Sequence, residues 1–193
     1  MDLNLMTPIN QLGYGIAGLN ICKSLSKMCN VSLFPMGPVD LAIREDVQPL
    51  QEAAMRSQKL NFDAPCLKIW HQHDLAQFVG RGLRIGFPFF ELDVFKDMEK
   101  HHLNNLDALF VASEWAKKIC LNNLTLPEEK IFVVPLGVNS DIFSPAKDST
   151  DNKTIFFNCG KWEVRKGHDV LVELFNFSFN EEDDVELWLM CSN

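Results

Sequence analysis

Three basic residues that lie close together in the sequence could bind a phosphate: Lys161, Arg165 and Lys166. They follow an apolar run at 154–157, which predicts a strand confined to that run, and precede apolar residues at helical spacing over 170–175. A turn between a strand and a helix lies at the carboxyl end of the strand, where open α/β sheets bind ligands. Helix N-termini favour anions, and neighbouring cations favour a phosphate further. We therefore expect half of a nucleotide-diphosphate site here. The alternative is an ordinary solvated basic turn.

A glycine-rich segment near the amino end has the spacing of a phosphate-binding turn. Gly13, Gly15 and Gly18 follow a predicted strand at 3–9 and open a predicted helix, which formally matches a dinucleotide fingerprint. The acidic residue that should end the next strand, at 31–34, is missing, and this argues against a nicotinamide dinucleotide. A glycine turn still lets backbone N–H groups approach a phosphate or a sugar closely. The alternative is a tight turn packed against the sheet.

Two histidines and one glutamate follow other predicted strands. His71 and His73 come directly after a strand at 66–70 and could be ligands or acid–base groups. Two histidines at this spacing, without a third and fourth ligand nearby, are a weak zinc signal, so no metal site is expected. In the alternative, one histidine is structural and the other exposed. Glu91 follows a predicted strand at 83–90 and is expected to open the next helix, where a carboxylate is favoured by the helix dipole.

The composition excludes several classes of partner. The chain has 193 residues, a net charge of −8 and dispersed basic residues, which argues against nucleic acid and against attraction to an anionic membrane. No apolar stretch approaches the roughly 20 residues that a membrane helix needs, and the N-terminus lacks the features of a signal peptide. Six cysteines without CxxC spacing are expected to be buried thiols in a reducing compartment. These features together predict a cytoplasmic protein.

The elements that must position these residues alternate between strand and helix along the whole chain, which predicts an α/β fold with a mainly parallel, doubly wound sheet. Residues 1–150 supply about six strand candidates, enough for one domain. A polar stretch at 146–153 is the expected linker. Residues 151–193 then form a single βαβ unit, which is too small to make a stable sheet alone.

Three segments resemble the family 4 retaining glycosyltransferases, which have the two-domain GT-B architecture. DALFVASEWAKKICLNN at 107–123 is similar to one strand and helix of that family, and KIFVVPLGVNSDIFSP at 130–145 is similar to its interdomain signature. GKWEVRKGHDVL at 160–171 is similar to its donor-phosphate turn. The resemblance implies an N-terminal Rossmann-like, acceptor-side domain at 1–150. It also implies that 151–193 begins a C-terminal Rossmann-like domain that binds a nucleotide sugar.

The resemblance assigns donor-binding roles to five residues. Lys161 and Lys166 match the cationic pair that neutralises the diphosphate of the nucleotide sugar, with Arg165 beside them. Lysine replaces the more usual arginine at 161, so a point charge stands in place of a bidentate phosphate contact. Gly13 and Gly15 match the loop under the sugar phosphate.

The resemblance also implies which residues meet the transferring sugar. His73 matches the second histidine of the family's H-x-H, and His71 is its less favoured partner. Glu91 follows an aromatic strand as in a mannosyltransferase-like subgroup. The family retains anomeric configuration and is thought to need neither a metal nor another cofactor, with a UDP- or GDP-sugar as substrate. The acceptor is a glycan, lipid or protein.

One departure from the family concerns the carboxyl end. The family's Glu-x7-Glu motif would lie beyond residue 193, so the chain is expected to be truncated and weakly active or inactive alone. Two rival interpretations remain. The chain is a non-catalytic module that binds a phosphorylated ligand or a partner, or it is another nucleotide-dependent enzyme such as a dehydrogenase or epimerase.

Overall fold

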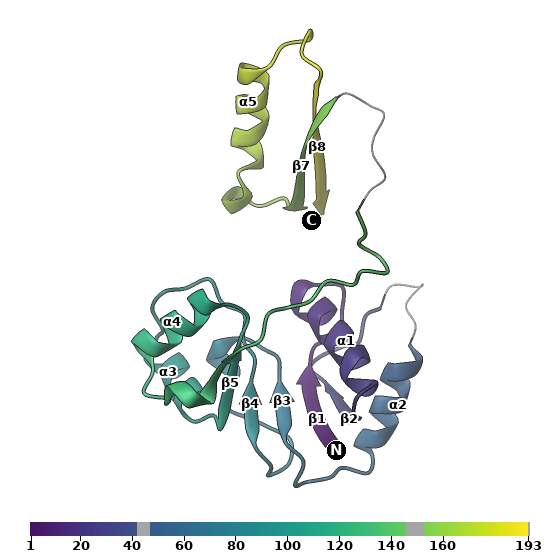
Figure 1. The fold of residues 1–193 in the computed structure, drawn as a ribbon, viewed down its shortest axis with the longest axis vertical. Helices are drawn as coiled ribbons and strands as arrows, with labels where there is room; N and C mark the ends of the chain where they lie inside the picture. Colours follow the sequence, from purple (N-terminus) through teal and green to yellow (C-terminus); the bar gives the residue numbers. More distant parts are fainter. Residues whose placement is uncertain (42–46, 146–152, 193) are drawn as a thin grey trace. The chain divides into compact units, whose positions relative to one another are not determined.

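The computed structural model describes residues 1–41, 47–145 and 153–192. The chain forms two compact units, unit 1 at Met1–Gly137 and unit 2 at Val138–Asn193. Figure 1 shows both. The predicted linker at 146–153 falls almost wholly outside the described residues, and the division at residue 150 stays a prediction.

Unit 1 is a six-stranded, entirely parallel sheet flanked by helices, which confirms the predicted α/β, Rossmann-like fold. The strands are β1 (Asp2–Thr7), β2 (Asn30–Pro35), β3 (Cys66–Lys68), β4 (Arg84–Gly86), β5 (Ala108–Val111) and β6 (Ile131–Val133). The helices are α1 (Gly13–Ser26), α2 (Gln48–Ser57), α3 (Asp97–Asn104) and α4 (Glu114–Asn123), with short 3-10 turns η1 (Gln72–Asp74) and η2 (Glu128–Lys130).

The strand order is β2-β1-β3-β4-β5-β6. The chain therefore adds β2 on one side of β1 and all later strands on the other. This change of direction between β1 and β3 is a topological switch point, the place where open α/β sheets leave a crevice at their carboxyl ends. The predicted glycine segment follows β1, and the predicted histidine segment follows β3.

Two apolar clusters hold unit 1 together. One joins β1, β2 and β3 to α1 and α2, and includes Leu5, Leu19 and Val31. The other joins β5 and β6 to α3 and α4, and includes Leu103 and Leu109. The short strands β5 and β6 consist of apolar residues, as is usual for parallel sheets covered by helices, whereas β1 and β2 also carry the buried polar residues Asn4 and Ser32.

Two details of the helices differ from expectation. Met28 continues the apolar spacing of Leu19, Cys22 and Leu25, which predicts that it faces inward, but it is 82% exposed because α1 ends at Ser26. Glu91 does not open a helix. It lies in a loop, and α3 begins six residues later at Asp97. The start of α3 is set by Glu99, whose carboxylate accepts the Lys96 backbone N–H at 2.7 Å, the N-terminal half of a capping box.

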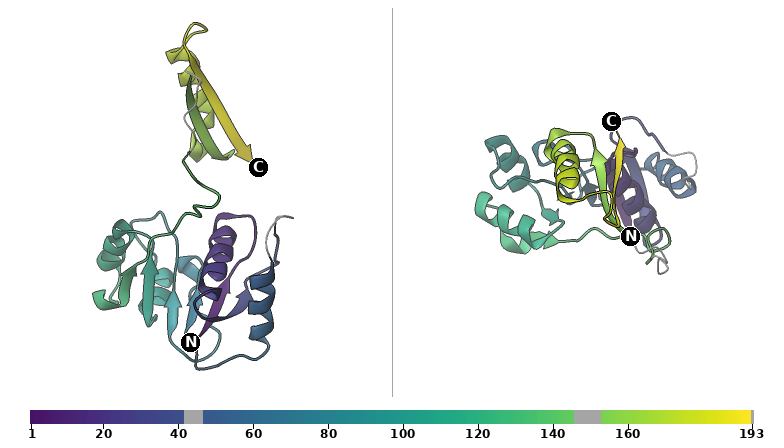
Figure 2. Two further views of the ribbon diagram at one scale, coloured as in Figure 1. Left: turned by 45° about the vertical axis from the view of Figure 1, so that its right-hand side comes forward. Right: turned by 90° about the horizontal axis from the view of Figure 1, so that it is seen from above.

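Unit 2 is a βαβ unit: β7 (Thr154–Lys161), 3-10 turn η3 (Val164–Lys166), α5 (His168–Ser178) and β8 (Val185–Ser192). β7 and β8 pair in parallel, and α5 lies beside them (Figure 2). The rings of Phe156 in β7 and Phe175 in α5 lie 5.8 Å apart. The predicted elements are confirmed, but β7 does not end before Asn158. The ladder continues to Lys161 because β8 supplies a partner for each residue.

Unit 2 leaves much of its apolar surface exposed. Phe157 and Trp188 are 61% and 52% exposed, since two strands and one helix cannot cover both faces of a sheet. For the same reason Cys159 and Cys191 are exposed, whereas buried thiols were expected. Cys22, Cys66 and Cys120 of unit 1 are buried, Cys29 is half-buried and all six are free. Among the described residues no helix is long and apolar enough to cross a membrane.

Candidate functional site

The carboxyl ends of β1 and β3 lie side by side at the switch point. Met6 pairs with Lys68, and the Ile69 backbone N–H donates to the Met6 carbonyl at 2.9 Å. The segment after β1 carries the glycine turn, and the segment after β3 carries His71 and His73. The sheet thus brings together two segments more than 50 residues apart.

The glycine turn places a helix N-terminus at this edge of the sheet. The Asn10 side-chain Oδ1 accepts the Leu12 backbone N–H at 3.0 Å, and α1 begins at Gly13. Leu12, the residue that caps the helix, provides no side-chain hydrogen bond. First-turn N–H groups have no partner within their own helix, and the helix dipole favours an anionic acceptor there.

The three glycines of the segment have different surroundings. Gly13 has nothing within 4 Å of the place where a Cβ would stand. A Cβ on Gly15 would overlap the backbone and Oδ1 of Asn10, and one on Gly18 would overlap the side chain of Thr7. Gly15 and Gly18 are thus required by close packing of α1 against the end of β1. Gly13 is the glycine that leaves space for a ligand.

An aromatic cluster surrounds His71. Its ring centroid lies 4.6 Å from that of Tyr14, 4.9 Å from Trp70 and 5.2 Å from His73, on which it stacks. Tyr14, the second residue of α1, donates its hydroxyl proton to the Phe89 carbonyl and accepts the Phe89 backbone N–H, both at 2.8 Å. Tyr14 therefore ties the glycine turn to the segments after β3 and β4.

The cluster keeps its polar groups neutral. Burial, with a smaller contribution from the charge of His73, lowers the pKa of His71 below its ordinary 6.5. Burial raises the pKa of Tyr14 to about 12, against the opposing hydrogen bond from Phe89. At neutral pH the site therefore offers an uncharged imidazole, able to donate and accept hydrogen bonds or to take a proton. His73 beside it is exposed.

Buried polar residues hold η1, which carries His73. Gln72 is 6% exposed and donates from Nε2 to the Glu99 carboxylate at 3.1 Å. The Lys68 ammonium is buried and lies 3.7 Å from the Asp74 carboxylate. These contacts link the end of β3 and η1 to the start of α3. Glu91 lies exposed in the loop after β4.

The basic turn of unit 2 has the predicted order of strand, turn and helix. Lys161 ends β7, and the stem of Lys166 lies over Gly160, within 4 Å of where a Cβ would stand. Arg165 is ion-paired with Glu163 at 2.8 Å, so its charge is partly neutralised. Gly167 has φ of 65°, a left-handed conformation that glycine adopts without strain.

The predicted site residues thus gather in two sets. The first set lies at the carboxyl ends of β1 and β3 in unit 1 and comprises Gly13, Gly15, His71 and His73. The second set comprises the three cations in the turn after β7 of unit 2. The assignment of both sets to one donor site stays a prediction. Tyr14, Trp70, Gln72 and Glu99 were not predicted. The sequence signal for two of them is their position: Tyr14 lies within the glycine motif, and Trp70 directly precedes His71.

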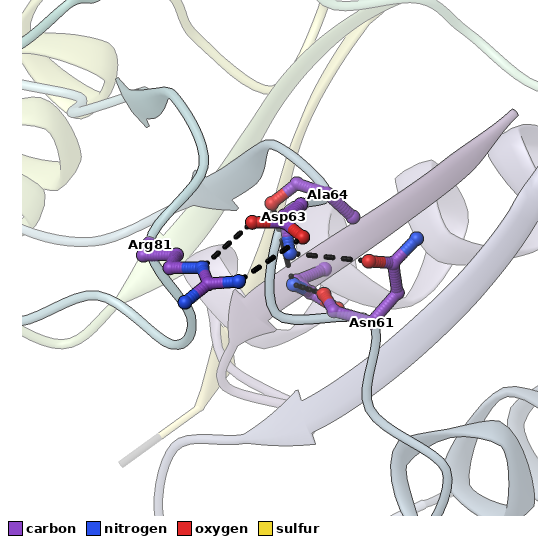
Figure 3. Close-up of polar contacts among 5 residues, drawn as sticks. Asn61, Asp63, Ala64 and Arg81 are labelled. Atoms are coloured by element: carbon purple, nitrogen blue, oxygen red, sulfur yellow. Dashed lines mark hydrogen bonds and ion pairs between the residues drawn. The ribbon is translucent and has the colours of Figure 1, made fainter.

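A hollow of unit 1 lies at the amino ends of the strands, away from the glycine turn and the histidines. It has a volume of about 730 Å³, and its lining includes Arg81, Arg84 and Asp107, near the starts of β4 and β5. Its arginines are already paired. Figure 3 shows Arg81 bound to Asp63 at 2.7 Å, beside a turn in which Asn61 Oδ1 accepts the Asp63 N–H. Because open α/β sheets bind ligands at their carboxyl ends, we do not assign the active site to this hollow.

No group of three or more histidine, cysteine or acidic side chains suited to a metal ion occurs among the described residues. Comparison of the chain with known protein-family models and with curated proteins found no match.

Proposed function

We propose that this chain carries part of a retaining glycosyltransferase that uses a UDP- or GDP-linked sugar. The observation that carries the proposal is the neighbouring position of the Gly13 turn and the His71–His73 pair at the β1/β3 switch point. Three further segments support it, because they resemble the family 4 enzymes in order and spacing. Of these, 107–123 forms β5 and α4, and 160–171 forms the turn between β7 and α5.

Each set of residues has a role in the proposed reaction. Backbone N–H groups of the Gly13 turn donate hydrogen bonds to an oxygen of the sugar or of its phosphate, and His71 and His73 contact the transferring sugar. As the glycosidic bond to the nucleotide breaks, negative charge grows on the departing diphosphate. Lys161 and Lys166 stabilise that charge. They lower the activation barrier for sugar transfer because they stabilise the transition state more than the bound donor.

The proposal includes low activity of this polypeptide by itself. Unit 2 contributes one βαβ unit to the proposed donor pocket, and two strands with one helix are only marginally stable alone. We expect UDP or GDP to bind through the basic turn, with weak or no sugar transfer to any acceptor. The acceptor is a glycan, lipid or protein.

A second candidate function is a non-catalytic binding module. The exposure of Phe157 and Trp188 in unit 2 favours it, because such a surface is suited to a partner chain. In that case the same turn binds a phosphorylated ligand without chemistry.

Thermal unfolding with and without nucleotide sugars tests the proposal. A ligand at a concentration 100 times its Kd stabilises the folded state by about 2.7 kcal/mol. We expect stabilisation by a UDP- or GDP-sugar, lost in Lys166→Ala and kept in Lys59→Ala, a control that removes an exposed lysine of unit 1. If no sugar nucleotide shifts the unfolding temperature, donor binding is refuted. Rapid donor-dependent transfer by the 193-residue chain would refute the expected low activity.

A further inference from the structure

One histidine in the basic turn is enclosed far better than its surroundings. Among the described side chains of unit 2, at 138–145 and 153–191, His168 alone is buried, with 2% of its surface exposed. Apolar residues on the same helix, such as Val170 and Leu174, are more than half exposed. The most enclosed point of unit 2 is therefore the turn that carries Lys161 and Lys166.

His168 connects the two ends of this turn. It is the first residue of α5, and its Nε2 lies 2.9 Å from the carbonyl oxygen of Lys161, the last residue of β7. The same carbonyl accepts the Glu163 backbone N–H at 2.9 Å. The imidazole also stacks on Trp162, with 5.0 Å between centroids and 11° between planes. The imidazole of His168 thus connects the end of β7, the basic turn and the start of α5.

These contacts determine which nitrogen carries the proton. A carbonyl oxygen can only accept, so Nε2 must donate. Nδ1 is buried and has no hydrogen-bond partner among the described residues. A proton on Nδ1 would be an unsatisfied buried donor, which is costly. The contacts therefore select the neutral tautomer with the proton on Nε2, and in this form His168 adds no positive charge to the turn.

We propose that His168 is a positioning residue, which as the neutral Nε2–H tautomer holds the basic turn in its phosphate-binding shape. The inference rests on the proposed function for the identity of the ligand. By tying β7 to α5, His168 keeps Lys161 and Lys166 next to the first N–H groups of α5, where a phosphate is favoured. A cationic histidine would act by charge. His168 acts by holding the geometry of the turn. A neutral side chain that keeps an N–H donor, as in His168→Gln, should therefore preserve nucleotide binding, which a role by charge would not allow.

The first experiment needs no ligand. Histidine ¹⁵N NMR of the 193-residue chain should show His168 as the Nε2–H tautomer. Hydrogen exchange should be slow at the backbone N–H groups of Lys166 and Gly167, which are bonded to carbonyls at 2.9 Å. His168→Ala should accelerate this exchange about five- to tenfold, as expected for one lost hydrogen bond of about 1 to 1.4 kcal/mol. His168→Gln, which keeps a side-chain N–H donor, should restore slow exchange. Finding the Nδ1–H tautomer, or equal exchange in His168→Ala, would overturn the inference.

The second experiment measures UDP and GDP affinity by calorimetry. We expect His168→Ala to weaken binding about five- to tenfold, His168→Gln to stay within about twofold of the parent, and the exposed-site control His101→Ala to match the parent. An equal loss in His168→Gln and His168→Ala would overturn the positioning role. If neither nucleotide binds the parent, the proposed function fails, and the exchange and tautomer results decide the positioning role on their own.

Discussion

Replacement of Gly15 by alanine should destabilise unit 1 strongly, although it adds one methyl group at a helix position. The added Cβ would overlap the backbone N and O of Asn10 as well as its Oδ1. Backbone atoms cannot rotate away as a flexible side chain can, so α1 must shift from the end of β1. Overpacking of this kind costs about 1 to 3 kcal/mol, and we expect the upper end, about 3 kcal/mol in the free energy of unfolding.

Gly13→Ala is the matched control in the same motif. Nothing lies within 4 Å of its Cβ position, and alanine is favoured over glycine in a helix, so we expect a gain of up to about 1 kcal/mol. Urea unfolding of both variants measures the two effects. The structural reasoning is refuted if Gly15→Ala unfolds within about 0.5 kcal/mol of the parent, the range of neutral surface substitutions, or if Gly13→Ala loses as much as Gly15→Ala.

Three further predictions concern single groups of unit 1. Tyr14→Phe keeps the ring but removes both hydrogen bonds to the main chain after β4, and should lower the free energy of urea unfolding by about 2 kcal/mol. An unchanged unfolding midpoint would show that these hydrogen bonds do not stabilise unit 1. NMR titration should find the pKa of His71 below 6.5 and should find it raised by His73→Ala. Since the unfolded chain then binds more protons, this imidazole destabilises the fold as the pH falls through 6.5. The pKa of Asp107 is lowered, first by the Arg84 backbone N–H, so Asp107→Asn should be less stable than the parent at pH 7. That difference should vanish as the pH falls below 3.8, and a constant difference would rule out the ionic contribution.

Much of the fold could be predicted from the sequence because several of its strands contain short apolar runs between turn residues. The run at 108–111 forms β5, and Ser113, a residue type that favours helix N-caps, accepts the Ala116 backbone N–H at 3.2 Å. The errors lie at element ends. Glu91 carries the charge that favours a helix start, but Glu99 was the glutamate placed to bond the N-cap backbone. β7 extends past Asn158 because β8 pairs with it, a contact that local periodicity cannot reveal.

The candidate site was predictable to a similar degree. Motif order placed Gly13 and His71 after neighbouring strands, and the parallel sheet put both at one edge. Tyr14 was missed although it lies within the glycine motif, because its partner Phe89 is 75 residues away. His168 was missed as well, since a histidine after a basic segment has no property that marks it as buried.

The sequence by itself determined where strands and helices alternate and which polar residues follow each strand, because these depend on neighbours within a few positions. Tertiary structure decided what those residues do. It separated Gly13, which is open to a ligand, from Gly15, which is closed by Asn10, and it enclosed His71 and His168 while leaving His73 exposed. These outcomes depend on distances between segments far apart in the chain, which are set when the helices pack against the sheet.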